Sequence, residues 1–250
     1  MNKVESRINL FNCPIDALSM DQTLDRIASE IENKGHMHHA FVNAATVVNL
    51  QKDSSLKNGI IHCDLISADG FGVILAAKLL GKSLPERVSG PDLMEKIVKL
   101  ANENGYKIYF LGAEQAVVEK VVKKYAEIYS PKIIAGFRNG YFTEDGAPLI
   151  AKQIADTNPN ILFVAITSPK KEKFLYENKK ILSNINFITG VGGCFDLVAG
   201  KTKRAPLWMQ KVGLEWFYRL IQEPRRLFMR YLTTNFLLFK LIIKTRFNNN

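Results

Sequence analysis

The chain has 250 residues, of which 47% are hydrophobic and 23% are charged, a composition typical of one large α/β domain or of one domain with an appendage. Its three cysteines, Cys13, Cys63 and Cys194, include no C-x-x-C pair, which argues against both a disulfide framework and a cysteine zinc site. The first residues are charged and contain no apolar segment of the signal-peptide kind, so we expect the protein to stay in the cytoplasm.

The net charge of +10 is concentrated at the C-terminal end. Residues 201–250 contain eleven lysines and arginines but two acids, which leaves residues 1–200 close to neutral. We therefore predict two parts: a catalytic or binding body over 1–200, and a basic helical appendage over 201–250 that seeks anions.

Up to residue 200, apolar runs alternate with amphipathic stretches, the pattern of βα units around a mostly parallel sheet. Strands are predicted at 38–42, 65–67, 107–111, 133–135, 161–166 and 187–189. Helices are predicted from a capping box at 19–22 to about 35, and at 43–50, 70–80, 91–104, 114–129, 145–156 and 169–182.

After Gly200 the pattern changes. Residues 207–222 are predicted to form one amphipathic helix, Pro224 to end it, and 225–247 to form another. The longest uncharged stretch of the second helix, 231–239, is far shorter than the ~20 residues that span a bilayer. We expect this helix to lie on a membrane without crossing it.

Two charged residues stand at expected loop positions. Asp69 follows the 65–67 strand, where open α/β sheets place ligands, although an N-cap aspartate with turn glycines is a competing interpretation. Arg87 lies just before a helix N-terminus, where guanidinium and free N–H groups can both meet a phosphate. The alternative is a surface arginine, with Asp92 favouring the helix dipole.

Glycines and histidines give weaker signals. The cluster Gly190-Val-Gly-Gly193 follows a predicted strand and would let the backbone approach a ligand, but it lacks the spacing of a dinucleotide fingerprint. The four histidines match no metal-site spacing. The chain also lacks a D-x-D pair, so we expect no metal and no other cofactor.

Five segments together carry a family resemblance, at 43–53, 68–94, 109–113, 190–200 and 204–226. The last contains the sequence RAPLWMQKVGLEWFYRLIQEPRR. Over nearly its whole length, the chain resembles the WecG/TagA/CpsF glycosyltransferase family.

That resemblance implies an inverting glycosyltransferase with a Rossmann-like core. The implied donor is UDP-N-acetylmannosamine or its uronic acid, and the implied acceptor is N-acetylglucosamine linked to undecaprenyl diphosphate. Asp69 matches the general base of the family, and Arg87 matches an arginine that neutralises diphosphate. The substrate-binding positions expected on this basis are Asn43, Gly70, Gly90, Asp92, Gly112, Lys171, Glu172, Gly190, Gly192, Gly193 and Asp196. The residues expected to bind diphosphate or lipid are Arg204, Arg219, Arg226 and Arg230.

The chain departs from the family pattern at two places. Phe41 stands where many members have a threonine, and Lys171 replaces the glutamine of G-x-P-x-Q-E. A charge at residue 171 could bind phosphate or recognise an acidic sugar, so the donor is left open between these chemistries.

The expected partners are the UDP-sugar, the lipid-linked acceptor and the anionic inner face of the plasma membrane, with no nucleic acid. We expect the helix over 207–222 to close over the active site and to bring Arg219 to a diphosphate, and a homo-oligomer is compatible with the family. The alternatives are a nucleotide-dependent oxidoreductase on a Rossmann core, which the incomplete glycine motifs disfavour, and a membrane-tethered scaffold without enzymatic activity.

Overall fold

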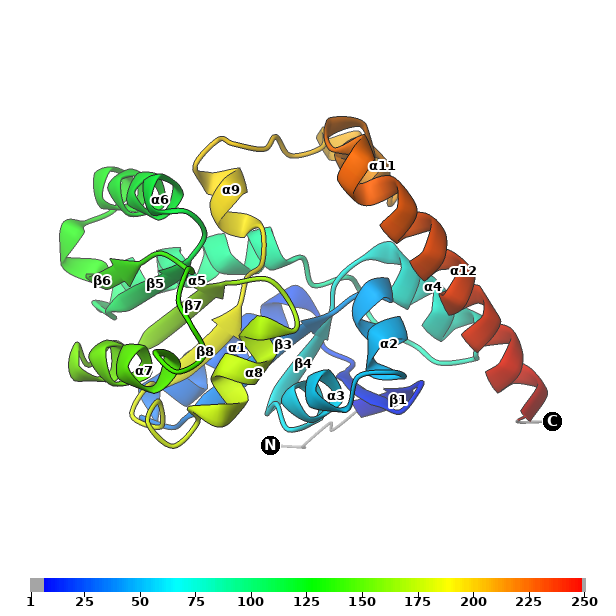
Figure 1. Ribbon diagram of the computed structural model, residues 1–250, viewed down its shortest axis with the longest axis horizontal. Helices are drawn as coiled ribbons and strands as arrows, with labels where there is room; N and C mark the ends of the chain where they lie inside the picture. The colour runs from blue at the N-terminus through cyan, green and yellow to red at the C-terminus, as the bar shows by residue number, and fades with distance from the viewer. Residues whose placement is uncertain (1–6, 249–250) are drawn as a thin grey trace.

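A parallel sheet forms the centre of the computed structural model, which describes residues 7–248 (Figure 1). Within those residues the sheet has six strands in the order β4-β3-β8-β7-β5-β6, and every neighbouring pair is parallel. The strands are β3 (Met37–Val42), β4 (Leu65–Ala68), β5 (Ile108–Gly112), β6 (Ile134–Arg138), β7 (Ile161–Ala165) and β8 (Phe187–Gly190). The predicted α/β fold and its strands are confirmed.

Helices cover both faces of this sheet (Figure 1). They are α1 (Met20–Glu32), α2 (Ala44–Leu50), α3 (Ser54–Ile61), α4 (Phe71–Leu79), α5 (Gly90–Asn104), α6 (Gln115–Ile128), α7 (Ala147–Asp156), α8 (Lys170–Glu177) and α9 (Cys194–Val198), with a short 3-10 helix, η1 (Pro131–Ile133). One core packs α1, α5, α6 and α9 against the sheet, and another packs α7 and α8 against the opposite side of β5, β7 and β8. A third core lies under α2, α3 and α4.

The ends of several helices follow from local sequence signals. Ser19 accepts a hydrogen bond from the backbone N–H of Gln22, whose side chain accepts one from Ser19 N–H, so the predicted capping box is confirmed. Asn43 is the N-cap of α2, since its side chain accepts a hydrogen bond from the backbone N–H of Thr46. Gly105 ends α5 with a φ of 71°, a left-handed conformation that glycine adopts without strain.

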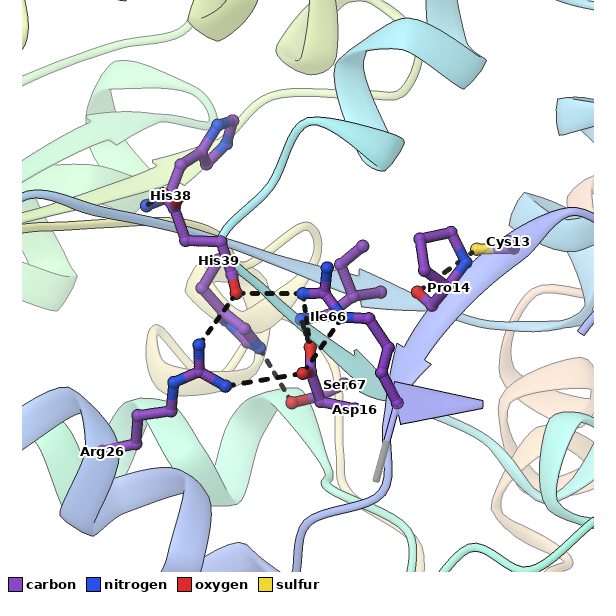
Figure 2. A network of polar contacts seen from close by, with 10 residues as sticks. Cys13, Pro14, Asp16, Arg26, His38, His39, Ile66 and Ser67 are labelled. Atoms are coloured by element: carbon purple, nitrogen blue, oxygen red, sulfur yellow. Dashed lines mark hydrogen bonds and ion pairs between the residues drawn. The ribbon is translucent and has the colours of Figure 1, made fainter. Parts of the chain in front are cut away.

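An N-terminal hairpin was not anticipated from the sequence. β1 (Arg7–Leu10) and β2 (Cys13–Asp16) pair antiparallel through a turn at Phe11 and Asn12, whose φ angles are 56° and 61°. Figure 2 shows how Asp16 attaches this hairpin to the sheet: its carboxylate accepts from Ile66 N–H at 2.7 Å and pairs with Arg26. The helix α3 was also missed.

The prediction of a single helix over 207–222 is wrong. This segment forms α10 (Leu207–Lys211) and α11 (Glu215–Gln222), and Gly213 between them has a φ of 76°. The turn packs closely on α4, because a Cβ atom at Gly213 would lie 2.6 Å from the Phe71 ring. Glycine therefore permits both the backbone conformation and the close approach.

The last helix begins where the sequence predicts. α12 (Pro224–Asn248) contacts α2 and α4 (Figure 1, orange to red), and it buries Leu227, Thr234 and Leu238 at a spacing that places them on one face. Leu238 belongs to the core under α2, α3 and α4. None of the helices that the structure describes is long and apolar enough to cross a membrane. The division of the chain at residue 200 stays a prediction.

Candidate active site

Asp69 lies at the carboxyl end of β4, as the sequence indicates. Its backbone N–H donates to the carbonyl of Val42 at the end of β3, at 2.8 Å. Gly70 follows with a φ of 102°, which lets the chain turn sharply into α4. Asn43 is close by: if Gly70 carried a Cβ atom, that atom would lie 3.7 Å from the Cβ of Asn43. The two strand ends thus bring together two of the predicted site residues.

The segment before α5 lies beside Asp69. Val88 N–H donates to the carbonyl of Ala68 at 3.0 Å, and the backbone N–H of Gly90, in the first turn of α5, donates to the Asp69 carboxylate. A Cβ on Gly90 would lie 3.7 Å from Asp69 Oδ2. The N-terminus of α5 therefore directs the Gly90 N–H, and the positive end of the helix dipole, towards the carboxylate.

Burial raises the pKa of Asp69 to about 6. Arg87 and Arg219 oppose this increase by their positive charge, whereas the negative charge of Glu215 adds to it. At neutral pH the carboxylate is therefore mainly ionised but more basic than an exposed aspartate. These are the properties of a general base that works near pH 7.

Arg87 is held by the appendage. Its Nη1 atom lies 2.8 Å from Glu215 Oε2, and both side chains are largely buried. The other carboxylate oxygen of Glu215 lies 3.8 Å from Arg204 Nε. Arg204 in turn pairs with Asp92, with a distance of 2.6 Å between Nη2 and Oδ2. A chain of alternating charges therefore runs from α5 to α11 along one side of Asp69.

Arg219 approaches the site from α11, above the glycine cluster. Its Nη2 atom lies 3.2 Å from the position of a Cβ on Gly193, so a side chain at that residue would crowd the guanidinium. Gly192 has a φ of 53°, and no atom lies within 4 Å of its Cβ position, which leaves its backbone open to a ligand. Arg219 of α11 is thus close enough to Asp69 to lower its pKa, while the closure of the first appendage helix over the site stays a prediction.

Lys171 and Glu172 form a pair at the start of α8. The distance between Lys171 Nζ and Glu172 Oε1 is 3.1 Å, and the two side chains are 17% and 7% exposed. The lysine side chain crosses Gly190, where a Cβ would lie 2.3 Å from its Cδ atom. A small cavity of about 10 Å³ lies beside it. The charge of Lys171 is therefore largely engaged by its neighbour.

Four other predicted residues have close local partners: Gly112, Asp196, Arg226 and Arg230. Gly112 has a φ of 136°, and a Cβ there would be 2.4 Å from the carbonyl oxygen of Ala165, so close strand packing accounts for this glycine. Asp196 is 3.8 Å from Lys201. Arg226 pairs with Glu223, and the guanidinium of Arg230 lies 5.3 Å from the centre of the Tyr231 ring.

Two of the histidines belong to the sheet. His38 and His39 lie inside β3, and burial lowers the pKa of His39 to about 3. The ring nitrogens of His39 bond to Thr189 Oγ1 and Ser67 Oγ, the latter contact being visible in Figure 2. Across residues 7–248 no three His, Cys, Asp or Glu side chains are grouped so as to hold a metal ion.

A larger hollow lies at the carboxyl end of β7, with a volume of about 280 Å³. Its lining residues are Ser55, Glu144, Thr167, Ser168, Pro169, Lys170 and Lys173. None of them belongs to the group around Asp69.

Glu215 is the site residue that the sequence interpretation missed. It entered only as one of two acids in a basic segment, although it stands in the GLEW part of the family resemblance. Its partner Arg87 is 128 residues away, so no local pattern could connect the two.

Comparisons with known proteins agree with the resemblance. The family described as "Glycosyl transferase WecG/TagA/CpsF family" matches residues 8–250. N-acetylglucosaminyldiphosphoundecaprenol N-acetyl-beta-D-mannosaminyltransferase of Bacillus subtilis is 37% identical over 175 residues, which cover 70% of this chain and 67% of the relative. The protein of the same name in Bacillus spizizenii is 32% identical over 163 residues, covering 65% and 62%. The matched region thus spans about two thirds of these relatives.

Proposed function

Because this chain belongs to the WecG/TagA/CpsF family and is a glycosyltransferase, we propose that it transfers an N-acetylmannosamine-type sugar from UDP to N-acetylglucosamine on undecaprenyl diphosphate. The names of the two relatives supply the sugar and the acceptor. The structural observation that carries the proposal is the position of Asp69, between the N-terminus of α5 and two arginines. Such a site suits a reaction between a neutral hydroxyl and a donor that carries a diphosphate.

In this mechanism Asp69 is the general base. It takes the proton from an acceptor hydroxyl while that oxygen attacks the anomeric carbon of the donor, and the bond from that carbon to the UDP oxygen breaks. Attack opposite the leaving group inverts the anomeric configuration. A raised pKa makes the Asp69 carboxylate a better proton acceptor, and a positioned base contributes roughly 10²–10⁴-fold to the rate.

Positive groups around Asp69 stabilise the departing UDP. Arg87 and Arg219 lie close enough to influence the Asp69 charge, and the N-terminus of α5 adds backbone donors. The negative charge on the diphosphate grows as the sugar leaves, so fixed cations lower the barrier. We propose that these arginines neutralise the leaving group without a divalent cation.

Lys171 bears on the choice of donor. Its ammonium group is paired with Glu172 and is 17% exposed, so it is not a free cation for a phosphate. A donor with a carboxylate would have to compete with Glu172 for it. We therefore favour the neutral N-acetylmannosamine over its uronic acid.

The appendage suits a membrane surface. The outward side of α12 carries Phe228, Leu232, Phe236 and Phe239, each more than half exposed, together with basic residues. Such a helix rests among headgroups, where each engaged basic residue is worth ~1 kcal/mol near anionic lipid. We propose that the protein associates peripherally with the cytoplasmic face of the plasma membrane, where a lipid-linked acceptor is accessible.

The test is a matrix of UDP-sugars against the lipid-linked acceptor, read by mass spectrometry of the lipid product. We expect the acceptor to gain one N-acetylhexosamine residue with UDP-N-acetylmannosamine, and UDP to be released in equal amount. No transfer with any donor would refute the proposal. Quenching of NAD(H) fluorescence without UDP binding would instead support an oxidoreductase.

A further inference from the structure

An exposed apolar row runs along α4. Phe71, Leu75 and Leu79 are 48%, 46% and 43% exposed. Their spacing of four residues places them on one side of the helix, while Val73, Ala76 and Ala77 on the opposite side are buried in the core. The packing of α4 on the body therefore does not require these three large side chains.

The row begins at the active site. Phe71 is two residues after Asp69, and its ring packs against the turn at Gly213 that precedes Glu215. From there to Leu79 the helix extends about 12 Å at 1.5 Å per residue. The row thus connects the immediate surroundings of the proposed base with the outer surface of the molecule.

The last helix runs beside this row along the whole of α4. Near the start of α4, Leu238 lies 3.6 Å from the position of a Cβ on Gly72, and at its end Arg246 Nη1 donates to the carbonyl of Leu79 at 2.9 Å. The exposed Lys78 lies between Leu75 and Leu79 in sequence. An apolar row with cations at its outer end fits a ligand that passes from the site into a layer of anionic headgroups.

The acceptor of the proposed reaction has this arrangement of parts. Its sugar hydroxyl must reach Asp69, its diphosphate follows, and a long hydrocarbon chain comes last. Towards α5 and α11 the surroundings of Asp69 are charged, with Arg87 and Glu215 paired there. Along α4 they are apolar, so a hydrocarbon chain loses contact with water by following that helix.

We propose that Phe71, Leu75 and Leu79 bind the first part of the acceptor's hydrocarbon chain. This inference rests on the proposed function, because it takes the acceptor to be lipid-linked. We infer that the apolar row binds one partner, the hydrocarbon chain of the acceptor, and not the bulk membrane or a second copy of the protein.

The test compares two acceptors with the same sugar diphosphate, one with a long polyprenyl chain and one with a short alkyl chain. Equilibrium binding of each is measured in the same detergent, on the wild type and on the double variant Leu75→Gln, Leu79→Gln. We expect the variant to bind the long-chain acceptor about tenfold more weakly and the short-chain acceptor equally well. Leu149→Gln on α7, at a leucine 62% exposed, is the matched control and should change neither affinity.

Three results would overturn the inference: unchanged affinity for the long-chain acceptor, equal weakening for both acceptors, or an equal loss of binding to anionic vesicles that contain no acceptor. A change in the mass of the variant by sedimentation would also overturn the inference, since the apolar row would then join two copies of the protein.

The proposed function is separable from this test. If the wild-type protein binds the long-chain acceptor more tightly but transfers no sugar, the proposed function alone is refuted. If it transfers sugar but binds both acceptors equally well, only the role of the apolar row in binding the hydrocarbon chain is refuted.

Discussion

Arg87 Nη1 and Glu215 Oε2 are 2.8 Å apart, and this contact joins the loop before α5 to the first turn of α11. Both side chains are about one fifth exposed. Arg204 is near the second oxygen of the same carboxylate. Glu215 is therefore paired with Arg87, the arginine that is proposed to bind the donor diphosphate. A bound diphosphate must displace the Glu215 carboxylate or share the Arg87 guanidinium with it.

Replacing this carboxylate should strengthen UDP binding. Glu215→Gln removes a competing anion and keeps the shape of the side chain. A partly exposed ion pair is worth up to about 1 kcal/mol, so we expect an increase in affinity of about fivefold by calorimetry. Glu223→Gln, which alters the pair with Arg226 on the same appendage, is the control and should leave the UDP affinity unchanged. Weaker binding by Glu215→Gln would show that Glu215 supports the phosphate site instead of competing for it.

The raised pKa of Asp69 predicts a stability change that depends on pH. The native state holds a proton that the unfolded chain releases between about pH 4 and pH 6, so stability falls as the pH rises through that window. Asn cannot ionise, so Asp69→Asn should be more stable than the wild type at pH 8, on the order of 2 kcal/mol, and similar to it at pH 4. Urea unfolding at the two pH values measures this. A variant that is less stable at pH 8 would contradict the assigned pKa.

Substitutions on the exposed face of α12 should affect membrane binding, whereas substitutions on its buried face should affect stability. Replacing Phe228, Leu232 and Phe239 with serine alters exposed positions, so we expect weaker binding to anionic vesicles with an unchanged melting temperature. Leu238→Ala is the matched control. It removes a buried side chain and should cost roughly 2–5 kcal/mol of stability while vesicle binding persists below the transition. Equal vesicle binding by the serine variant and the wild type would exclude this face as the membrane contact.

Chelation of divalent cations should not stop the reaction. With Arg87, Arg219 and the N-terminus of α5 next to the leaving group, we expect the transfer rate to stay within a few-fold in excess EDTA. The control is addition of Mg²⁺ or Mn²⁺ after chelation, which should restore nothing. A strict requirement for either ion would show that the diphosphate is bound in another way.

The regular parts of the fold were predictable because their signals are local. β5 and β7 are buried at every residue and read as continuous apolar runs, and the ends of α1 and α2 carry side chains that cap them. The break between α10 and α11 was missed because the apolar periodicity continues through Gly213. The hairpin of β1 and β2 was missed because its strands have four residues each, and its turn uses Phe11 and Asn12 in place of glycine.

The candidate site was predictable only in part. Asp69 and Arg87 stand at strand and helix ends that the sequence marks, and the family resemblance supplied their roles. Which ends lie together depends on the strand order β4-β3-β8, which is set by packing across the whole sheet. Glu215 illustrates the limit, since its partner lies in a different part of the chain and neither residue signals the other.

The role of Asp69 as the general base is tested by the turnover of Asp69→Asn with UDP-N-acetylmannosamine and the lipid-linked acceptor, measured together with UDP affinity. We expect turnover to fall by ~10²-fold or more while UDP affinity stays within a few-fold of the wild type, because Asn cannot accept the proton from the acceptor hydroxyl. Turnover within a few-fold of the wild type would contradict it, since the base would then have to be another group.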